Sequence, residues 1–392
     1  MTAVFEREAE VVMQTYARSP VGFSSGDASW LVDNEGNRYL DFLTGLAVVS
    51  VGHANRAVAE AVAHQMSTLV HVSNLFYTDP MVALAEALVA RSGLDRVFFA
   101  NCGATANEAA IKLARRYGQA HHGVGRYKVV SLVDSFHGRT LATLAATGQP
   151  AKQATFDPLP PGFLQVAPGD IAALDAVVDD TVAAVMVETT QGEGGVRPLD
   201  EGYLQAVRRL CDERGSLLIV DDVQAGMGRT GSWFSWQQLG FAPDIATTAK
   251  ALANGLPIGV AMATEEVAAA FQRGDHATTF GGGPVVCAAA LAVIREIEDR
   301  QLLTNCQARS AQLSAALEVL PGVVEVRGRG LLLAARLDTE RAVDVARRAL
   351  LDEHLIVNAV RPDAVRFAPP LTVSAPEVEE AVTRFAAALS TG

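Results

Sequence analysis

Lys250 occupies surroundings that are unusual for a lysine. It closely follows an apolar strand predicted over residues 244–248, and its neighbours in the chain are small or apolar. A lysine withdrawn from water loses its proton more easily and can attack a carbonyl carbon. Because lysines at strand ends more often extend their amines into the solvent, the position of Lys250 alone leaves both interpretations open.

Asp221 stands at a corresponding position, at the end of a buried strand predicted over residues 217–221. A carboxylate there is costly unless it meets a cation or a hydrogen-bond donor, and a protonated pyridine nitrogen is one such partner. The alternative is an acidic helix cap. Since the chain between Asp221 and Lys250 is about one strand-crossover unit long, we expect the two residues on adjacent strands.

Two further segments follow predicted strands. Residues 101–108 enter a helix through Gly103, where free backbone N–H groups and the positive helix end favour an anion such as a phosphate. Residues 135–140 offer the aromatic face of Phe136 and the guanidinium of Arg139, which suits a carboxylate. Each segment alone is more often an ordinary turn or loop, so their combination is what indicates a site.

A glycine-rich motif at 226–231, Gly-Met-Gly-Arg-Thr-Gly, matches the spacing of dinucleotide-binding loops. The run Ser-Trp-Phe-Ser-Trp follows it, however, where such a loop requires an apolar helix. A nicotinamide-dependent oxidoreductase is therefore a weak alternative. The histidines show no metal-ligand spacing, and we expect no metal site.

The elements that must position these residues alternate along the chain. Short apolar strands separated by helical patterns predict an α/β fold, with a mostly parallel sheet sandwiched by helices. In such sheets ligands bind beyond the carboxyl ends of the strands. The predicted strands are 96–100, 128–133, 183–188, 217–221, 244–248 and 258–262.

The two ends of the chain have a different pattern. Residues 30–42 alternate around an Asn-Glu-Gly turn and residues 323–337 surround two glycines, so both segments predict hairpins. We therefore predict a large domain at 53–285 and a smaller α+β domain built from 1–52 and 286–392.

The composition excludes several classes of protein. Of the 392 residues, 49% are hydrophobic and 19% are charged, which indicates a folded chain with a large core. The net charge of −12 argues against a nucleic-acid or anionic-membrane partner. The longest apolar run, 285–294, is too short to span a membrane, and the acidic start is unlike a signal peptide. Since the four cysteines are dispersed, we expect a cytoplasmic protein.

Over nearly its whole length, the chain resembles the class-III aminotransferases, which have fold type I of the enzymes dependent on pyridoxal 5′-phosphate (PLP). Within that family it is most similar to the acetylornithine aminotransferases. The motifs that carry the resemblance include Asn107-Glu-Ala-Ala-Ile-Lys-Leu-Ala-Arg115, Ser135-Phe-His-Gly-Arg-Thr140, Gln191-Gly-Glu-Gly-Gly195, Gly226-Met-Gly-Arg-Thr-Gly231, Thr279-Phe-Gly-Gly282 and Arg366-Phe-Ala-Pro-Pro-Leu371.

The resemblance implies that the large domain binds PLP, held covalently by Lys250. Gly103 and Ala104 would bind its phosphate, and Phe136 would stack on its ring. Asp221 would pair with the pyridinium nitrogen. The remaining cofactor contacts that the resemblance implies are Asp222, Val223, Gln224 and, from the neighbouring subunit of a homodimer, Thr279.

The resemblance also implies the reaction. The ω-amino group of N2-acetylornithine would pass to 2-oxoglutarate, giving N-acetylglutamate 5-semialdehyde and glutamate in arginine biosynthesis. Lys250 would move the proton as general base and acid. Arg139 and Thr278 would hold the substrate carboxylate. Glu193 would pair with Arg366 in one half-reaction and release it for the second carboxylate of 2-oxoglutarate in the other.

The chain departs from the usual family sequence near these residues. These departures leave open another donor, such as ornithine, succinylornithine, acetyl-lysine or 4-aminobutyrate, or a PLP-binding homologue with impaired catalysis. The departing residues are Cys102 in place of the usual Ser, Thr105 in place of Glu, Asp222 in place of Glu, Thr189 and Thr190 in place of Pro and Ile, and Gly283 in place of Asn.

Overall fold

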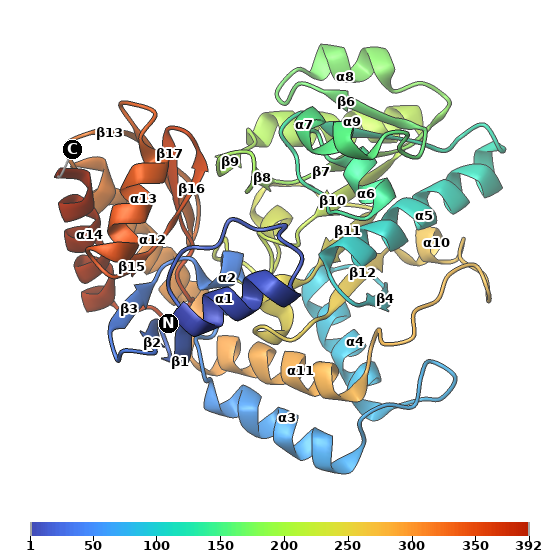
Figure 1. Cartoon of the computed structure of the whole chain (residues 1–392). Helices are drawn as coiled ribbons and strands as arrows, with labels where there is room; N and C mark the ends of the chain where they lie inside the picture. The colour runs from blue at the N-terminus through green and yellow to red at the C-terminus, as the bar shows by residue number, and fades with distance from the viewer. Residues whose placement is uncertain (1, 391–392) are drawn as a thin grey trace.

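A seven-stranded sheet forms the centre of the protein (Figure 1), whose computed structural model describes residues 2–390. In spatial order its strands are β4 (Arg96–Ala100), β12 (Gly259–Ala263), β11 (Ile245–Thr248), β10 (Leu217–Asp221), β7 (Val182–Val187), β5 (Lys128–Leu132) and β6 (Phe163–Val166). All neighbours from β11 to β6 are parallel, and β12 runs antiparallel to β11 and β4. This topology confirms the predicted α/β fold with a mostly parallel sheet.

The direction of β12 follows from the length of its connection to β11. Residues 249–258 link the two strands, whereas a parallel return needs a crossover of about a dozen residues or more. β12 therefore pairs antiparallel with β11. The connection begins with the short 3-10 helix η3 (Lys250–Ala253), so it places the predicted catalytic lysine at the end of β11.

Helices cover both faces of this sheet, which explains why its strands are apolar throughout. On one face of the sheet, Ile111 of α5 and Ile219 of β10 belong to the same hydrophobic core. On the other face, Leu204 of α9 and Val220 of β10 belong to a second core. Within residues 2–390, no helix is both long and apolar enough to cross a membrane. The surrounding helices are α3 (Arg56–Thr68), α4 (Asp79–Ser92), α5 (Gly103–His122), α6 (Leu141–Ala146), α7 (Pro150–Gln153), η1 (Ala154–Phe156), α8 (Ile171–Val177), α9 (Glu201–Arg214), η2 (Ser235–Gln238), α10 (Glu265–Ala268) and α11 (Pro284–Asp299).

The strand β6 is the member of this sheet that the sequence pattern did not predict. It lies at the edge of the sheet, and its residues are mostly half-buried or exposed, so no continuous apolar run marks it. The other strands agree with the predicted bounds to within one residue at each end.

The two ends of the chain come together on the opposite side of the molecule from α5 (Figure 1). The antiparallel pairs β2–β3 and β13–β14 confirm the two predicted hairpins. β15 pairs in parallel with β3, so both chain ends share one sheet. The boundaries of the two domains stay a prediction. The elements here are α1 (Thr2–Val11), β1 (Phe23–Asp27), β2 (Trp30–Asp33), β3 (Arg38–Asp41), the left-handed turn α2 (Thr44–Ala47), α12 (Leu302–Glu318), β13 (Val323–Arg329), β14 (Leu332–Leu337), α13 (Ala342–Leu351), β15 (Leu355–Ile356), β16 (Asn358–Arg361), β17 (Ala364–Phe367) and α14 (Ala375–Ser390).

The glycine-rich turn at 226–231 joins the central sheet to these terminal elements. Its Arg229 is fully buried and donates to the carbonyls of Leu331 (3.1 Å) and Pro369 and to the hydroxyl of Ser50 (3.2 Å). The turn leads into the short helix η2 and not into the long helix that a dinucleotide-binding loop needs. The motif therefore has a structural role here.

Candidate active site

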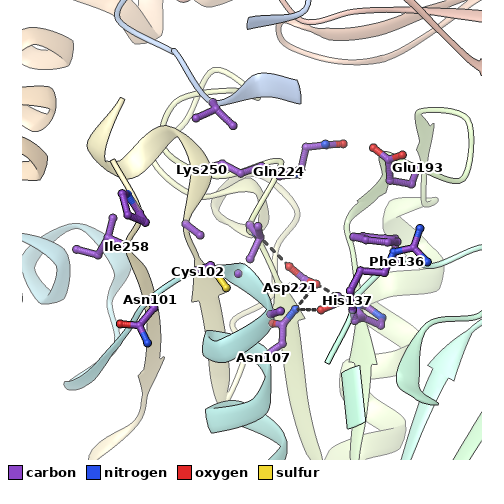
Figure 2. Close-up of a pocket in the computed structure, with 18 of the residues that line it drawn as sticks. Asn101, Cys102, Asn107, Phe136, His137, Glu193, Asp221, Gln224, Lys250 and Ile258 are labelled. Atoms are coloured by element: carbon purple, nitrogen blue, oxygen red, sulfur yellow. Dashed lines mark hydrogen bonds and ion pairs between the residues drawn. The ribbon is translucent and has the colours of Figure 1, made fainter. Parts of the chain in front are cut away.

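Most of the residues predicted to do chemistry surround one cavity of about 370 Å³ beyond the carboxyl ends of the strands (Figure 2). Asp221 comes from the end of β10, Lys250 from η3 and Gly103 from the start of α5. Phe136 and Arg139 come from the segment after β5. Because β10 and β11 are parallel neighbours, Asp221 and Lys250 approach one another as expected. The other predicted site residues that line the cavity are Ala104, Glu193, Val223 and Gln224.

Lys250 presents its amine to this cavity. Its backbone has a φ of 40°, in the left-handed region that is strained for residues with a side chain and that is enriched at functional sites. Among residues 2–390, its amine has no hydrogen-bond or ion-pair partner. Burial lowers the pKa of Lys250, although Glu193 opposes the effect. The neutral amine, which is the nucleophilic and proton-accepting form, is thereby favoured.

Asp221 is held in one orientation by three donors. Its Oδ2 accepts from Asn107 Nδ2 at 2.8 Å and lies 2.8 Å from His137 Nδ1, which donates because an ionised carboxylate only accepts. Its Oδ1 accepts from the backbone N–H of Val223 at 3.1 Å. Burial alone would lower the pKa of His137, but the hydrogen bond and charge of Asp221 raise it. Asn107 is fixed in turn by the Thr247 hydroxyl, at 2.6 Å.

The start of α5 is built to receive an anion. The first N–H groups of a helix, here those of Gly103 and Ala104, have no partner within the helix. A Cβ at Gly103 would lie 2.7 Å from Val223 Cγ1, so only glycine fits. Thr105 Oγ1 accepts from the backbone N–H groups of Asn101 and Cys102, both at 3.0 Å. Thr105 thereby performs the capping task of the Glu that is usual in the family.

Glu193 and Arg366 form the ion pair that the resemblance implied. Arg366 Nη1 donates to Glu193 Oε1 at 2.6 Å, and Arg366 Nε donates to Asn358 at 3.1 Å. Burial alone would raise the pKa of Glu193, but Arg366 outweighs it, so the pKa is lowered. The side chain of Arg366 is 1% exposed and that of Glu193 is 27% exposed. Glu193 therefore lies between the cavity and the buried guanidinium and is the partner with room to move.

Glu188 is a buried carboxyl group of the cavity that the sequence reasoning missed. Burial raises its pKa to about 7. Its two oxygens accept from the backbone N–H groups of Phe136 (3.0 Å) and Gly192 (3.4 Å), so it ties the segment that presents the aromatic ring to the turn that presents Glu193. The signal that singled out Asp221, an acid at the end of a buried strand, also applies to Glu188.

Asp222 points away from the cavity, although it was predicted to contact the cofactor. Its carboxyl group accepts from the backbone N–H of Ser235 at 3.0 Å and from the Ser235 hydroxyl. The Thr189 hydroxyl donates to that same serine oxygen at 2.6 Å. Two departures from the usual family sequence, Asp222 and Thr189, thus meet in one buried hydrogen-bonded group.

This group predicts a pH-dependent stability. Burial raises the pKa of Asp222 to about 7 from 3.8. The folded state therefore keeps a proton that the unfolded state releases, and stability is full below about pH 4 and is lost as the pH rises to about 7. Asp222→Asn cannot ionise, and it can still make two bonds to Ser235: its amide oxygen accepts from the backbone N–H and its NH₂ group donates to the hydroxyl oxygen. We expect the variant to unfold at a temperature about 2 °C or more above that of the wild type at pH 8, with a smaller difference at pH 5.

The comparison between variant and wild type at each pH cancels the titration of all other groups. Thermal unfolding followed by circular dichroism provides the measurement. An Asp222→Asn variant that unfolds at the wild-type temperature at both pH values would show that Asp222 does not titrate in this way.

Thr278 and Thr279 do not line the cavity around Lys250 in the single chain. Thr278 is hydrogen-bonded to Asn101 at 3.2 Å and accepts from the Gly281 N–H at 3.2 Å. Thr279 is exposed and lines a separate hollow of about 790 Å³ beside α4. Neither residue is brought to Lys250 of its own chain.

A family model described as aminotransferase class-III matches residues 12–389. The chain belongs to the class-III aminotransferases. The predicted family, fold class and enzyme class are confirmed, and the cavity around Lys250 is the candidate active site of an aminotransferase.

Relatives of known structure or curated sequence resemble this aminotransferase over nearly its full length. The acetylornithine aminotransferase of Gloeobacter violaceus is 50% identical over 376 residues, which cover 95% of this chain and 94% of the relative. The structure of N-acetylornithine aminotransferase from Stenotrophomonas maltophilia K279a matches with a TM-score of 0.83 and 34% identity, covering 96% and 97%. The ornithine aminotransferase from Toxoplasma gondii, described with partial occupancy of PLP at its active site, matches with a TM-score of 0.94 and 32% identity, covering 99% and 94%.

Proposed function

We propose that this aminotransferase uses PLP to move the ω-amino group of N2-acetylornithine to 2-oxoglutarate, giving N-acetylglutamate 5-semialdehyde and glutamate in arginine biosynthesis. The observation that carries the choice of substrate is the 50% identity with an acetylornithine aminotransferase over 95% of the chain. The Glu193–Arg366 pair beside Lys250 supports it, since the cavity must accept substrates with one and with two carboxylates.

The groups around the cavity fit PLP. The free N–H groups of Gly103 and Ala104 suit its phosphate, Phe136 offers a face for stacking, and Asp221 suits a protonated ring nitrogen. Gln224 Nε2 is buried without a partner among residues 2–390, so it can donate to an oxygen of the ligand. When bound, PLP supplies an electron sink for the charge that develops on the substrate carbon attached to nitrogen.

The residues of the chain supply orientation and proton transfer. The neutral Nζ of Lys250 accepts the proton that leaves the amine-bearing carbon of the substrate and later returns it. Asn107 and His137 hold Oδ2 of Asp221 and so fix the orientation of its carboxylate at the cavity. Arg139, exposed at the cavity, binds the carboxylate that is remote from the reacting carbon.

The Glu193–Arg366 pair supports a two-state carboxylate site. The reacting carbon of N2-acetylornithine carries no carboxylate, so Glu193 neutralises Arg366 while this donor is bound. The reacting carbon of glutamate or 2-oxoglutarate does carry one, and Arg366 binds it when Glu193 swings aside. Glu193→Gln removes the competing charge and should therefore favour glutamate.

We expect Glu193→Gln to raise the ratio of kcat/KM for glutamate to that for N2-acetylornithine by about 10-fold or more, since a hydrogen bond between charged groups contributes ~1.5–3 kcal/mol. Glu325→Gln is the matched control, because Glu325 pairs with Arg336 on the surface at 2.7 Å. Steady-state rates with both donors provide the ratio. An unchanged ratio in Glu193→Gln would contradict the two-state site.

We also propose a cytoplasmic homodimer in which Thr279 of each subunit reaches the cofactor of its partner. Thr279 lies beside Phe280, which is 68% exposed, and near the exposed Phe76. Exposed apolar side chains of this kind suit a second copy of the chain. The four cysteines are free, which agrees with a reducing compartment.

A panel of donors tests the proposed substrate. Initial rates of the PLP-loaded enzyme with 2-oxoglutarate are compared for N2-acetylornithine, ornithine, succinylornithine, acetyl-lysine and 4-aminobutyrate. We expect the highest kcat/KM with N2-acetylornithine. A higher value for another donor would replace the substrate and keep the enzyme class.

A further inference from the structure

Two cations stand over the same aromatic ring at the edge of the active site. The Nζ of Lys152, on α7, lies 5.1 Å from the centroid of the Phe136 ring, and the guanidinium carbon of Arg139 lies 5.5 Å from it. Lys152 is half-buried. In the part of the chain that the structure describes, neither side chain forms a hydrogen bond or an ion pair.

The charges nearby are already committed to other partners. Glu193 pairs with Arg366 at 2.6 Å, and Arg361 pairs with Asp134 at 2.5 Å. Burial lowers the pKa of Lys152, and the charge of Arg139 lowers it further. The charge of Glu193 acts on the pKa of Lys152 in the opposite sense. The like charges of Lys152 and Arg139 repel one another, and an anion bound to both would relieve that repulsion.

We propose that Lys152 is a specificity-determining residue that binds the remote carboxylate of the substrate together with Arg139. This inference rests on the proposed function, in which both substrates carry a carboxylate on the side away from the reacting carbon. A carboxylate offers about four acceptor sites, and a guanidinium fork occupies two of them, so the ammonium of Lys152 can occupy another. The pair thus selects donors that carry a carboxylate over simple amines.

Two donors that differ only in this carboxylate test the proposal. N2-acetylornithine carries it, and N-acetyl-1,4-diaminobutane is the same molecule without it. Lys152→Met keeps the apolar stem and removes the charge. We expect it to lower kcat/KM for N2-acetylornithine by about 10- to 100-fold, as for a lost hydrogen bond between charged groups, with little change for the diamine.

Two further variants test whether the positive charge of Lys152, at its position beside the active site, causes the selectivity for donors with a carboxylate. Lys152→Arg keeps the positive charge and should retain most of the selectivity. Lys128→Met removes the same charge from the start of β5, at the opposite end of the strand from the cavity, and should leave both donors unchanged. Equal losses for both donors in Lys152→Met would indicate a structural role only and would overturn the proposal.

A binding measurement separates this proposal from that of the reaction. Glutarate carries two carboxylates and no reactive group, and its affinity for the PLP-loaded enzyme is measured by isothermal titration calorimetry. We expect Lys152→Met to weaken glutarate binding about 10-fold or more, whatever donor the enzyme prefers. Wild-type affinity in the variant would overturn the role of Lys152, whereas failure of N2-acetylornithine alone would overturn only the proposed donor.

Discussion

Lys250→Ala is expected to lower turnover by about 10⁴-fold or more, at the upper end of what a positioned acid–base group contributes. Among residues 2–390, the amine of Lys250 has no hydrogen-bond or ion-pair partner, and burial lowers its pKa, which favours the nucleophilic neutral form. Its removal takes away both the covalent attachment proposed for PLP and the atom that moves the proton. Because the lysine is strained and desolvated, the fold should not be destabilised. The visible absorption of the PLP-loaded protein and its steady-state rate measure these effects.

A second substitution shows whether charge or proton transfer matters. Lys250→Arg keeps the positive charge, but a guanidinium does not lose its proton and cannot attack a carbonyl carbon. We therefore expect Lys250→Arg to be as inactive as Lys250→Ala, with both variants folded by circular dichroism. A Lys250→Ala variant that retained turnover within 10-fold of the wild type would exclude the assigned role.

Asp221→Asn should lower kcat by roughly 10²- to 10⁴-fold, corresponding to ~3–5 kcal/mol for a broken buried charge pair. The carboxylate now accepts from Asn107, His137 and Val223. An amide at this position places an NH₂ group among these donors and removes the charge that would hold a pyridinium nitrogen. We expect PLP to be retained less tightly as well, measured as the cofactor concentration that restores half of the activity.

Asp244→Asn is the matched control for this loss. Asp244 directly precedes β11, at the end of the parallel strands that lies away from the cavity. Its carboxylate accepts from Arg208 and from the Leu218 N–H, both at 2.7 Å. Its amide variant should lose stability but keep its kcat and its affinity for PLP. If both variants lost kcat equally, the effect of Asp221 would be that of a damaged sheet and not of a cofactor contact.

The sequence alone predicted those elements that are marked by the residues of one short stretch of the chain. Continuous apolar strands predicted the sheet, and strand ends predicted that Asp221 and Lys250 would meet. The same local signal, an acid after a buried strand, was present at Glu188 and could have placed it in the cavity. The alternation of an extended chain could also have separated the roles of Asp221 and Asp222, because adjacent residues there point in opposite directions.

Other features depend on packing between distant segments. The contact of Asn107 with Asp221 requires α5 to pack across β10, and the contact of Asp222 with Ser235 requires the turn after β10 to fold back. Lys152 comes near Arg139 only because α7 packs beside the segment after β5. The role proposed for Thr279 involves a neighbouring subunit, so it is outside what one chain can position. Thr278 was predicted to hold the substrate carboxylate, but its hydroxyl is instead hydrogen-bonded to Asn101 and Gly281.

The most direct test of the proposed function follows the absorption spectrum of the PLP-loaded enzyme through each half-reaction separately. N2-acetylornithine alone should convert the bound cofactor to its amino form, faster than any other donor in the panel, and 2-oxoglutarate alone should then restore the starting spectrum. Bound PLP that neither N2-acetylornithine nor any other donor converts would contradict transamination by this cavity, and would instead indicate a protein that keeps the cofactor without turning it over.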